Sequence, residues 1–156
     1  MKRVLILIAG LFLFAAGPPR RPVIVTITPA QPVEIAAGTT VEYQLELNIL
    51  KGFHIQANPA SGEYYIPVTA KLQAVDGISI GDPVYPKGIP FRLKGSNRDI
   101  STYEGKIIIK IPIEVATTAK PGDTTLKGTL RYQGCDAELC FPPVTMPLET
   151  KLRIKK

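Results

Sequence analysis

The chain has 156 residues, with 15 Pro, 13 Gly, two Cys and no Trp. This length suits one domain, and so many Pro and Gly residues leave little room for the long helices of a bundle. Two cysteines are too few for a disulfide-dense scaffold, but they are enough for one bridge or one redox pair. The formal net charge of +6 comes mainly from scattered Lys and Arg. Nucleic-acid binding needs a clustered basic patch with stacking aromatics, so we expect no nucleic-acid partner.

The first residues predict export. Lys2 and Arg3 precede an apolar run over residues 4–17, which is typical of a signal peptide. A helix of that length would span about 21 Å, less than the ~30 Å hydrocarbon core of a bilayer. We expect residues 1–17 to be a signal peptide or an uncleaved N-terminal anchor, with membrane contact only if the segment is retained. Residues 18–22, all Pro or Arg, are expected to form a linker.

After the linker, the chain is a succession of short β patterns. Residues 41–49 alternate apolar and polar side chains, as expected for a strand with one buried face. Comparable patterns, separated by turn clusters rich in Pro and Gly, occupy residues 23–27, 66–72, 106–115, 126–132 and 146–154. Without a helical stretch between them, these patterns predict an all-β fold over residues 23–156, an immunoglobulin-like antiparallel β-sandwich.

Three segments have additional features. Pro112 lies inside the strand pattern 106–115; because Pro lacks an N–H, it predicts an edge strand or a bulge. The basic C-terminal residues 151–156 alternate with apolar ones, as on the solvated face of an edge strand. Residues 85–103 are rich in Gly, Pro, Ser and Asn and predict one long irregular loop, of the kind that is usually functional or mobile.

The two cysteines lie between predicted strands. Cys135 and Cys140 are part of the segment YQGCDAELCFPP, residues 132–143. Facing positions of a hairpin bring Cα atoms to about the 4.4–6.8 Å that a disulfide needs. Closing a six-residue loop stabilises a fold by only about 2 kcal/mol in the chain-entropy model, against about 4.7 kcal/mol for a 100-residue loop. A short bridge near the surface is easy for a partner thiolate to attack, so a redox-active and a structural role both stay open.

A metal site is a third alternative. The cysteine pair supplies half of a zinc site, which needs four ligands. The only histidine, His54, is far upstream, and we expect it to be a hydrogen-bonded structural residue. Copper(I) held by both thiolates and Met146 is the remaining option, but no Met-rich or His-rich tract supports it. We expect no metal and no cofactor. Asp136 and Glu138 are expected to raise the pKa of the thiols, because negative charge disfavours the thiolate.

The segment YQGCDAELCFPP resembles the cysteine motif of the N-terminal, periplasmic domain of the thiol:disulfide interchange protein DsbD. Upstream, GFHI at 52–55, NP at 58–59, YIP at 65–67 and PVYPKG at 83–88 resemble the same family in order and rough spacing. The resemblance covers about residues 25–155. The cysteines are one residue closer in sequence here than in the best-known members.

The resemblance implies an immunoglobulin-like domain whose cysteine pair shuttles electrons, as a thiol–disulfide oxidoreductase. It implies that Cys140 forms mixed disulfides with partners and that Cys135 resolves them. It also implies a cap loop within residues 85–103, with Phe91 shielding the cysteines.

The partners implied are thioredoxin-fold proteins. Since the sequence shows neither a transmembrane electron carrier nor a thioredoxin-like domain, we expect them to act in trans, with a membrane thiol transporter as electron donor. The expected acceptors are periplasmic disulfide isomerase-like or other oxidised proteins. The competing hypothesis is a non-catalytic exported binding module whose disulfide only pins a hairpin.

Overall fold

The computed structural model describes residues 22–29 and 31–156. The predicted export segment, residues 1–17, and residues 18–21 of the predicted linker lie outside the described residues. Within the described ranges the chain forms twelve β-strands and no helix, so the all-β prediction is confirmed. In this part of the chain, nothing forms a helix long and apolar enough to cross a membrane.

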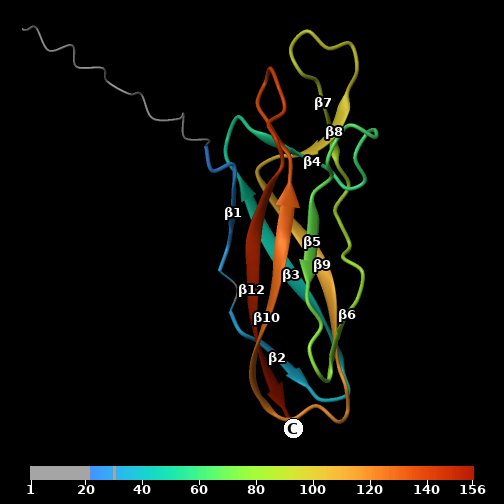
Figure 1. Ribbon diagram of the computed structural model, residues 1–156, viewed down its shortest axis with the longest axis vertical. Helices are drawn as coiled ribbons and strands as arrows, with labels where there is room; N and C mark the ends of the chain where they lie inside the picture. The colour runs from blue at the N-terminus through green and yellow to red at the C-terminus, as the bar shows by residue number, and fades with distance from the viewer. Residues whose placement is uncertain (1–21, 30) are drawn as a thin grey trace, which may run out of the picture.

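Two four-stranded sheets form the body of the molecule (Figure 1). The first is antiparallel, with its strands in the order β1 (Val25–Ile27), β3 (Thr40–Ile49), β9 (Lys106–Val115), β6 (Ile78–Ile80). The second has the order β2 (Val33–Ala36), β12 (Val144–Lys155), β10 (Gly122–Tyr132), β5 (Thr69–Leu72). After β1 the chain leaves the first sheet, and β2 pairs with the last strand, β12, in the second sheet. This pairing is parallel. The second sheet is therefore mixed rather than purely antiparallel.

The core lies between these two sheets. From Tyr43 in β3 and from Ile109 in β9, every second residue is buried, as the alternating pattern predicted. The second sheet supplies buried residues from β10 and β12 to the same cluster. Burying a large aliphatic side chain stabilises a fold by roughly 1.5–3 kcal/mol, so this two-sided apolar layer holds the immunoglobulin-like sandwich together. The main contributors are Leu45, Leu47, Ile109, Ile111, Ile113, Leu126, Leu130, Leu148 and Leu152.

Pro112 does not mark an edge strand, so that alternative is wrong. β9 lies between β3 and β6. The other alternative, a bulge, agrees with the register, because the chain takes four steps from Ile80 to Val84 where β9 takes three from Ile113 to Lys110. The carbonyl of Pro112 accepts a hydrogen bond from Gly81 N at 2.9 Å, so the ring nitrogen faces the side on which β6 has already ended at Ile80. No ladder hydrogen bond is lost there. A Cβ at Gly81 would lie 3.0 Å from Pro112 Cβ, so the glycine leaves room for the ring.

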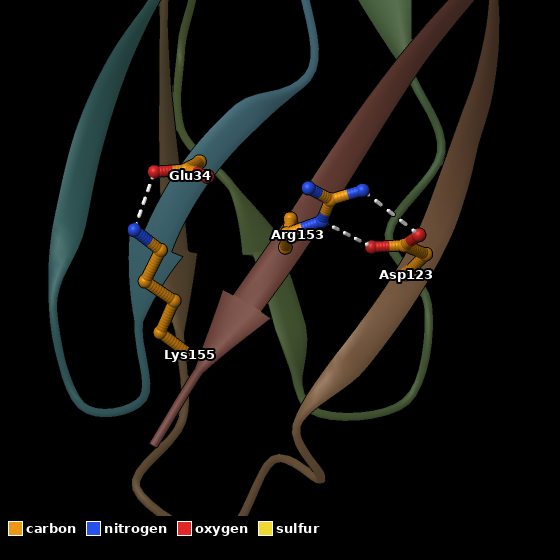
Figure 2. Close-up of polar contacts among 4 residues, drawn as sticks. All are labelled: Glu34, Asp123, Arg153 and Lys155. Atoms are coloured by element: carbon orange, nitrogen blue, oxygen red, sulfur yellow. Dashed lines mark hydrogen bonds and ion pairs between the residues drawn. The ribbon is translucent and has the colours of Figure 1, made fainter.

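The basic C-terminal strand is also not an edge strand. β12 has β2 on one side and β10 on the other. Its charged side chains reach acidic partners on both neighbours (Figure 2): Lys155 contacts the Glu34 carboxylate, and Arg153 donates to Asp123 at 2.8 and 3.3 Å. The alternation of residues 151–156 therefore marks a solvated face of an interior strand, on which Arg153 and Lys155 each contact an acidic side chain of a neighbouring strand.

A third, smaller sheet lies at the end of the sandwich opposite the C-terminus (Figure 1). Its strands have the order β11 (Gly134–Cys135), β4 (His54–Gln56), β8 (Ile100–Tyr103), β7 (Ile89–Phe91). The sequence predicted one long irregular loop over residues 85–103, and this prediction is wrong. The segment contains the antiparallel pair β7–β8 with a turn at residues 92–99. These strands are short, and β8 takes its other partner, β4, from far upstream. A local pattern therefore did not reveal them.

The strand predicted over residues 66–72 begins only at Thr69. Before it, Ile66 N donates to the Gln133 side chain at 3.0 Å and Val68 N donates to Gln56 O at 3.1 Å. These bonds turn residues 66–68 toward the third sheet and away from a regular ladder.

Candidate functional site

Cys135 and Cys140 face each other across a tight hairpin and form a disulfide. Phe141 N donates to Gly134 O at 2.8 Å and Asp136 N donates to Leu139 O at 3.0 Å. The cysteines are thus a cross-strand pair with no backbone hydrogen bond between them, the closer of the two kinds of facing pair. Their Cα atoms are 3.9 Å apart, nearer than the predicted 4.4–6.8 Å.

Both ends of this hairpin are tied to the body of the domain. Gln133, just before it, accepts from Ile66 N at 3.0 Å through Oε1 and donates to Phe141 O at 3.1 Å through Nε2. Gly134 packs so closely against Ile24 that a Cβ there would overlap the Ile24 side chain. A larger residue at this position would have to displace the end of the Ile24 side chain, so the geometry of the segment depends on contacts outside the cysteine motif.

The carboxylate of Asp136 organises the turn between the cysteines. Its Oδ1 accepts hydrogen bonds from the backbone N–H groups of Leu139 and Glu138, each at 2.8 Å. These bonds, the Leu139 one above all, hold the pKa of Asp136 below its ordinary value. The Glu138 carboxylate lies 3.1 Å from Lys94 Nζ. Both acidic residues thus have partners of their own beside the bridge, and their expected influence on the thiols stays a prediction.

The two cysteines differ in exposure. Cys135 is completely buried at the end of β11, whereas Cys140 is partly exposed. The neighbouring Leu139 is half exposed, at 50%. A partner that approaches the hairpin from solvent therefore reaches Cys140 first.

Gln56, on β4, is a functional candidate that sequence reasoning missed. Its side-chain Nε2 lies 3.4 Å from Cys135 Sγ and 3.5 Å from Cys140 Sγ, and the residue is completely buried. In β4 it lies two positions after His54, which pairs in register with Cys135, so the side chains of all three share one face of the third sheet. The available signal was a polar residue within a β-rich segment, which by itself does not indicate a partner 79 positions away.

His54 and Phe91 lie next to the cysteine strand. His54 Nε2 is 3.1 Å from Glu104 Oε2, and the His54 and Phe91 rings are stacked with centroids 3.7 Å apart. His54 thus has a carboxylate next to one ring nitrogen, but its other ring nitrogen, Nδ1, is buried without a hydrogen-bond partner among the described residues, so the predicted hydrogen-bonded histidine is met only in part. Since His54 is the register partner of Cys135, Phe91 lies one side chain away from the cysteine strand. Its shielding role stays a prediction.

The turn at residues 92–99 reaches the cysteine hairpin. Lys94 N donates to Ala137 O at 2.8 Å, and Lys94 Nζ contacts Glu138. In Figure 1 this turn, in yellow, rises beside the orange-red hairpin at the upper end of the molecule. The structure thus brings part of the predicted cap region to the cysteines, although its backbone is more regular than predicted.

The described ranges contain no group of three or more His, Cys, Asp or Glu side chains placed to hold a metal ion. The reactive group that the site presents is its disulfide. A disulfide reacts with thiolates by exchange, so exchange is the chemistry that this arrangement offers.

Fold and site together define a small β-sandwich domain with one disulfide hairpin at its end. Residues 23–151 match the family described as thiol:disulfide interchange protein DsbD, N-terminal, and the chain belongs to this family. This confirms the resemblance recognised from the cysteine motif. Among solved structures, the chain is similar to the reduced N-terminal domain of DsbD from Neisseria meningitidis. That match has a TM-score of 0.48 and 19% identity, and it covers 72% of this chain and 78% of the other. No protein with a curated description matches.

Proposed function

We propose that residues 23–156 form a periplasmic thiol:disulfide interchange domain that passes reducing equivalents between thioredoxin-fold partners. The observation that carries this proposal is the asymmetry of the bridge: Cys140 is partly exposed, whereas Cys135 is buried beside Gln56. Membership of the DsbD N-terminal family supports it. Residues 1–17 would direct export or anchor the chain, and residues 18–22 would link them to the domain.

The first half of the cycle reduces the bridge. A thiolate of the electron donor, a membrane thiol transporter acting in trans, attacks Cys140 Sγ. The S–S bond breaks and its electron pair leaves on Cys135 Sγ. A second donor thiolate then attacks the donor sulfur of the mixed disulfide and releases Cys140 as a thiolate. The donor departs as a disulfide, and the domain holds two more electrons.

The second half passes these electrons on. The Cys140 thiolate attacks the disulfide of an oxidised client, such as a disulfide isomerase-like protein, and one client sulfur leaves as a thiolate. Cys135, as a thiolate, attacks Cys140 Sγ, which restores the bridge and releases the second client sulfur. Two electrons enter and two leave, so neither a cofactor nor a metal takes part in these steps.

The surroundings of the bridge would regulate this exchange. We assign the turn at residues 92–99 and Phe91 a shielding role, because a reduced dithiol in an oxidising compartment must avoid indiscriminate partners. The carboxylates of Asp136 and Glu138 would raise the pKa of the thiols and keep the free domain a slow nucleophile. The contact of Lys94 with Ala137 supports a closed arrangement in the free domain.

Trapping tests the proposal. In a Cys135→Ser variant, Cys140 cannot be released by its partner cysteine, so mixed disulfides with thioredoxin-fold proteins of the native periplasm should accumulate. The matched Cys140→Ser variant keeps only the buried cysteine and should trap far less. Absence of any adduct, together with a reduction potential well below about −300 mV, would overturn the proposal in favour of a binding module with a structural bridge.

A further inference from the structure

The amide of Gln56 is held in place against both sulfurs. Its backbone N donates to Gln133 O at 3.0 Å, and its carbonyl accepts from Val68 N at 3.1 Å. With the backbone fixed on both sides and the side chain completely buried, the two N–H groups of Nε2 lie within reach of Cys135 Sγ and Cys140 Sγ. The contact is therefore built into β4.

These hydrogen bonds gain strength when the bridge opens. A disulfide sulfur is a weak acceptor, whereas a thiolate carries a full negative charge, and hydrogen bonds to ionised acceptors are about twice as strong as neutral ones. Low local dielectric strengthens them further. An interaction that grows as charge develops on the leaving sulfur stabilises the transition state more than the starting state.

The other end of the same amide is unused in the oxidised domain. Gln56 Oε1 is buried and has no hydrogen-bond partner among the described residues. A buried acceptor without a partner destabilises the state in which it occurs. Reduction and protonation of one cysteine place an S–H donor beside this amide. In the oxidised domain neither sulfur carries a hydrogen that this acceptor could use, whereas a thiol does.

We propose that Gln56 is a catalytic residue of disulfide exchange, whose amide stabilises the sulfur that leaves when the Cys135–Cys140 bond opens. Its contribution to partner reduction rests on the proposed function, whereas its effect on the bridge itself does not. The charged and titratable groups around the site are His54 on β4 with Glu104 just after β8, and Asp136, Glu138 and Lys94 at the turns. All of these are retained when only Gln56 is changed.

The test compares the full chain with a Gln56→Met variant, which keeps the side-chain length but has no N–H donor. Each protein is equilibrated with reduced and oxidised glutathione, and the reduced fraction is measured by thiol alkylation. At a pH where the reduced cysteine beside the amide is ionised, the equilibrium constant for reduction should fall about tenfold, since hydrogen bonds to charged groups are worth at least that factor. This corresponds to a reduction potential about 30 mV lower. The alkylation rate of Cys140 in the reduced variant should also reach its plateau at higher pH.

Thr102→Val is the matched control. Thr102 is buried on β8, in register with Gln56, and its hydroxyl donates to Ile89 O at 3.5 Å. This substitution removes a buried hydroxyl next to Gln56 but leaves the amide itself in place, so the glutathione equilibrium and the alkylation profile should stay at wild-type values. An equal shift in both variants would show a general packing effect and overturn the proposal. A Gln56→Met domain with wild-type behaviour would overturn it as well.

If Gln56→Met fails to fold, NMR of the unsubstituted chain decides. The Gln56 side-chain amide signals should move on reduction and should titrate together with the alkylation profile of Cys140. Signals that stay in place would refute the proposal. Glutathione serves as the reductant in every arm, so failure to trap protein partners would count against the proposed function alone.

Discussion

Reduction of the Cys135–Cys140 bond is expected to lower the free energy of unfolding by only about 2 kcal/mol. The perturbation is a chemical reductant applied to the folded chain, which breaks one bond, turns Cys135 and Cys140 into thiols and leaves every other side chain unchanged. The cysteines are five positions apart, so the bond closes a loop of six residues. This short loop makes the bridge a weak constraint on the unfolded chain.

The chain-entropy relation gives about 2.2 kcal/mol at 25 °C for a loop of this length. Below the pH at which the reduced cysteines ionise, the folded state adds little to that figure, because the hairpin keeps other contacts after reduction and the Gln56 amide faces no thiolate. The hydrogen bonds of Phe141 N to Gly134 O and of Asp136 N to Leu139 O remain, as do those made by the Gln133 side chain. By the thermodynamic cycle, the folded bridge is then only about 45 mV harder to reduce than the same bridge in an unfolded chain.

Urea unfolding of the oxidised and reduced protein measures this difference, with the slope on urea concentration compared between the two forms. A Cys135→Ala, Cys140→Ala double variant, unfolded with and without reductant, shows whether the reductant acts on anything besides the bridge. Equal slopes for oxidised and reduced protein would show that both forms expose the same amount of surface on unfolding.

A loss of about 4 kcal/mol or more, or loss of the cooperative transition, would refute the reasoning. It would mean that the bridge holds the third sheet together and would favour the structural role. No change within about 0.5 kcal/mol would contradict the chain-entropy estimate itself.

Three further predictions concern the hairpin and the core. Gly134→Ala should lower the free energy of unfolding by about 1–3 kcal/mol, because the new methyl group would overlap Ile24; an unchanged urea midpoint would contradict this close contact. Asp136→Ala should speed hydrogen exchange of the Glu138 and Leu139 amides, because they lose their acceptor. The control Asp136→Asn keeps an acceptor oxygen and should leave the exchange rates unchanged. Equal rates in the two variants would count against the turn contact. Because these amides lower the pKa of Asp136, their protection should be present at neutral pH and lost as pH falls through that lowered value. Burial raises the pKa of Tyr43, Tyr103 and Tyr132 above the value of about 10 that tyrosine has in an unfolded chain. The free energy of unfolding that these residues contribute is therefore complete below about pH 10 and is lost as pH rises through the pKa values of the folded state. Urea unfolding between about pH 8 and 12 tests this, and phenylalanine substitutions that leave the alkaline loss undiminished would refute it for Tyr43, Tyr103 and Tyr132.

The long strands were predictable because their pattern is local. β9 matches its predicted range, and β3 differs by one residue, since side chains of a strand alternate between two faces whatever strand lies beside it. The cysteine hairpin was predictable for a similar reason: its two thiols and its turn lie within one short segment. The family resemblance carried by the same segment is confirmed by the match over residues 23–151.

The positions of strands within a sheet were not predictable in the same way. Pro112 and the basic residues 151–156 both suggested edge strands, yet β9 and β12 are interior. A proline is tolerated inside a sheet where its nitrogen faces a position beyond the end of the neighbouring strand, and that depends on where β6 stops. Likewise, a charged alternating face marks solvent on one side of a strand and carries no information about its hydrogen-bonded neighbours.

The sequence by itself determined that the chain is a β protein with one pair of thiols on a loop too short to stabilise it strongly. The alternation of apolar and polar side chains and the spacing of the two cysteines are local properties, so they do not depend on how the other strands pair. The tertiary structure alone decided what surrounds the sulfurs. Gln56 is 79 positions from Cys135, and Lys94 is 44 positions from Glu138. Contacts over such separations depend on which strands lie side by side, and that pairing is settled only when the whole sandwich closes.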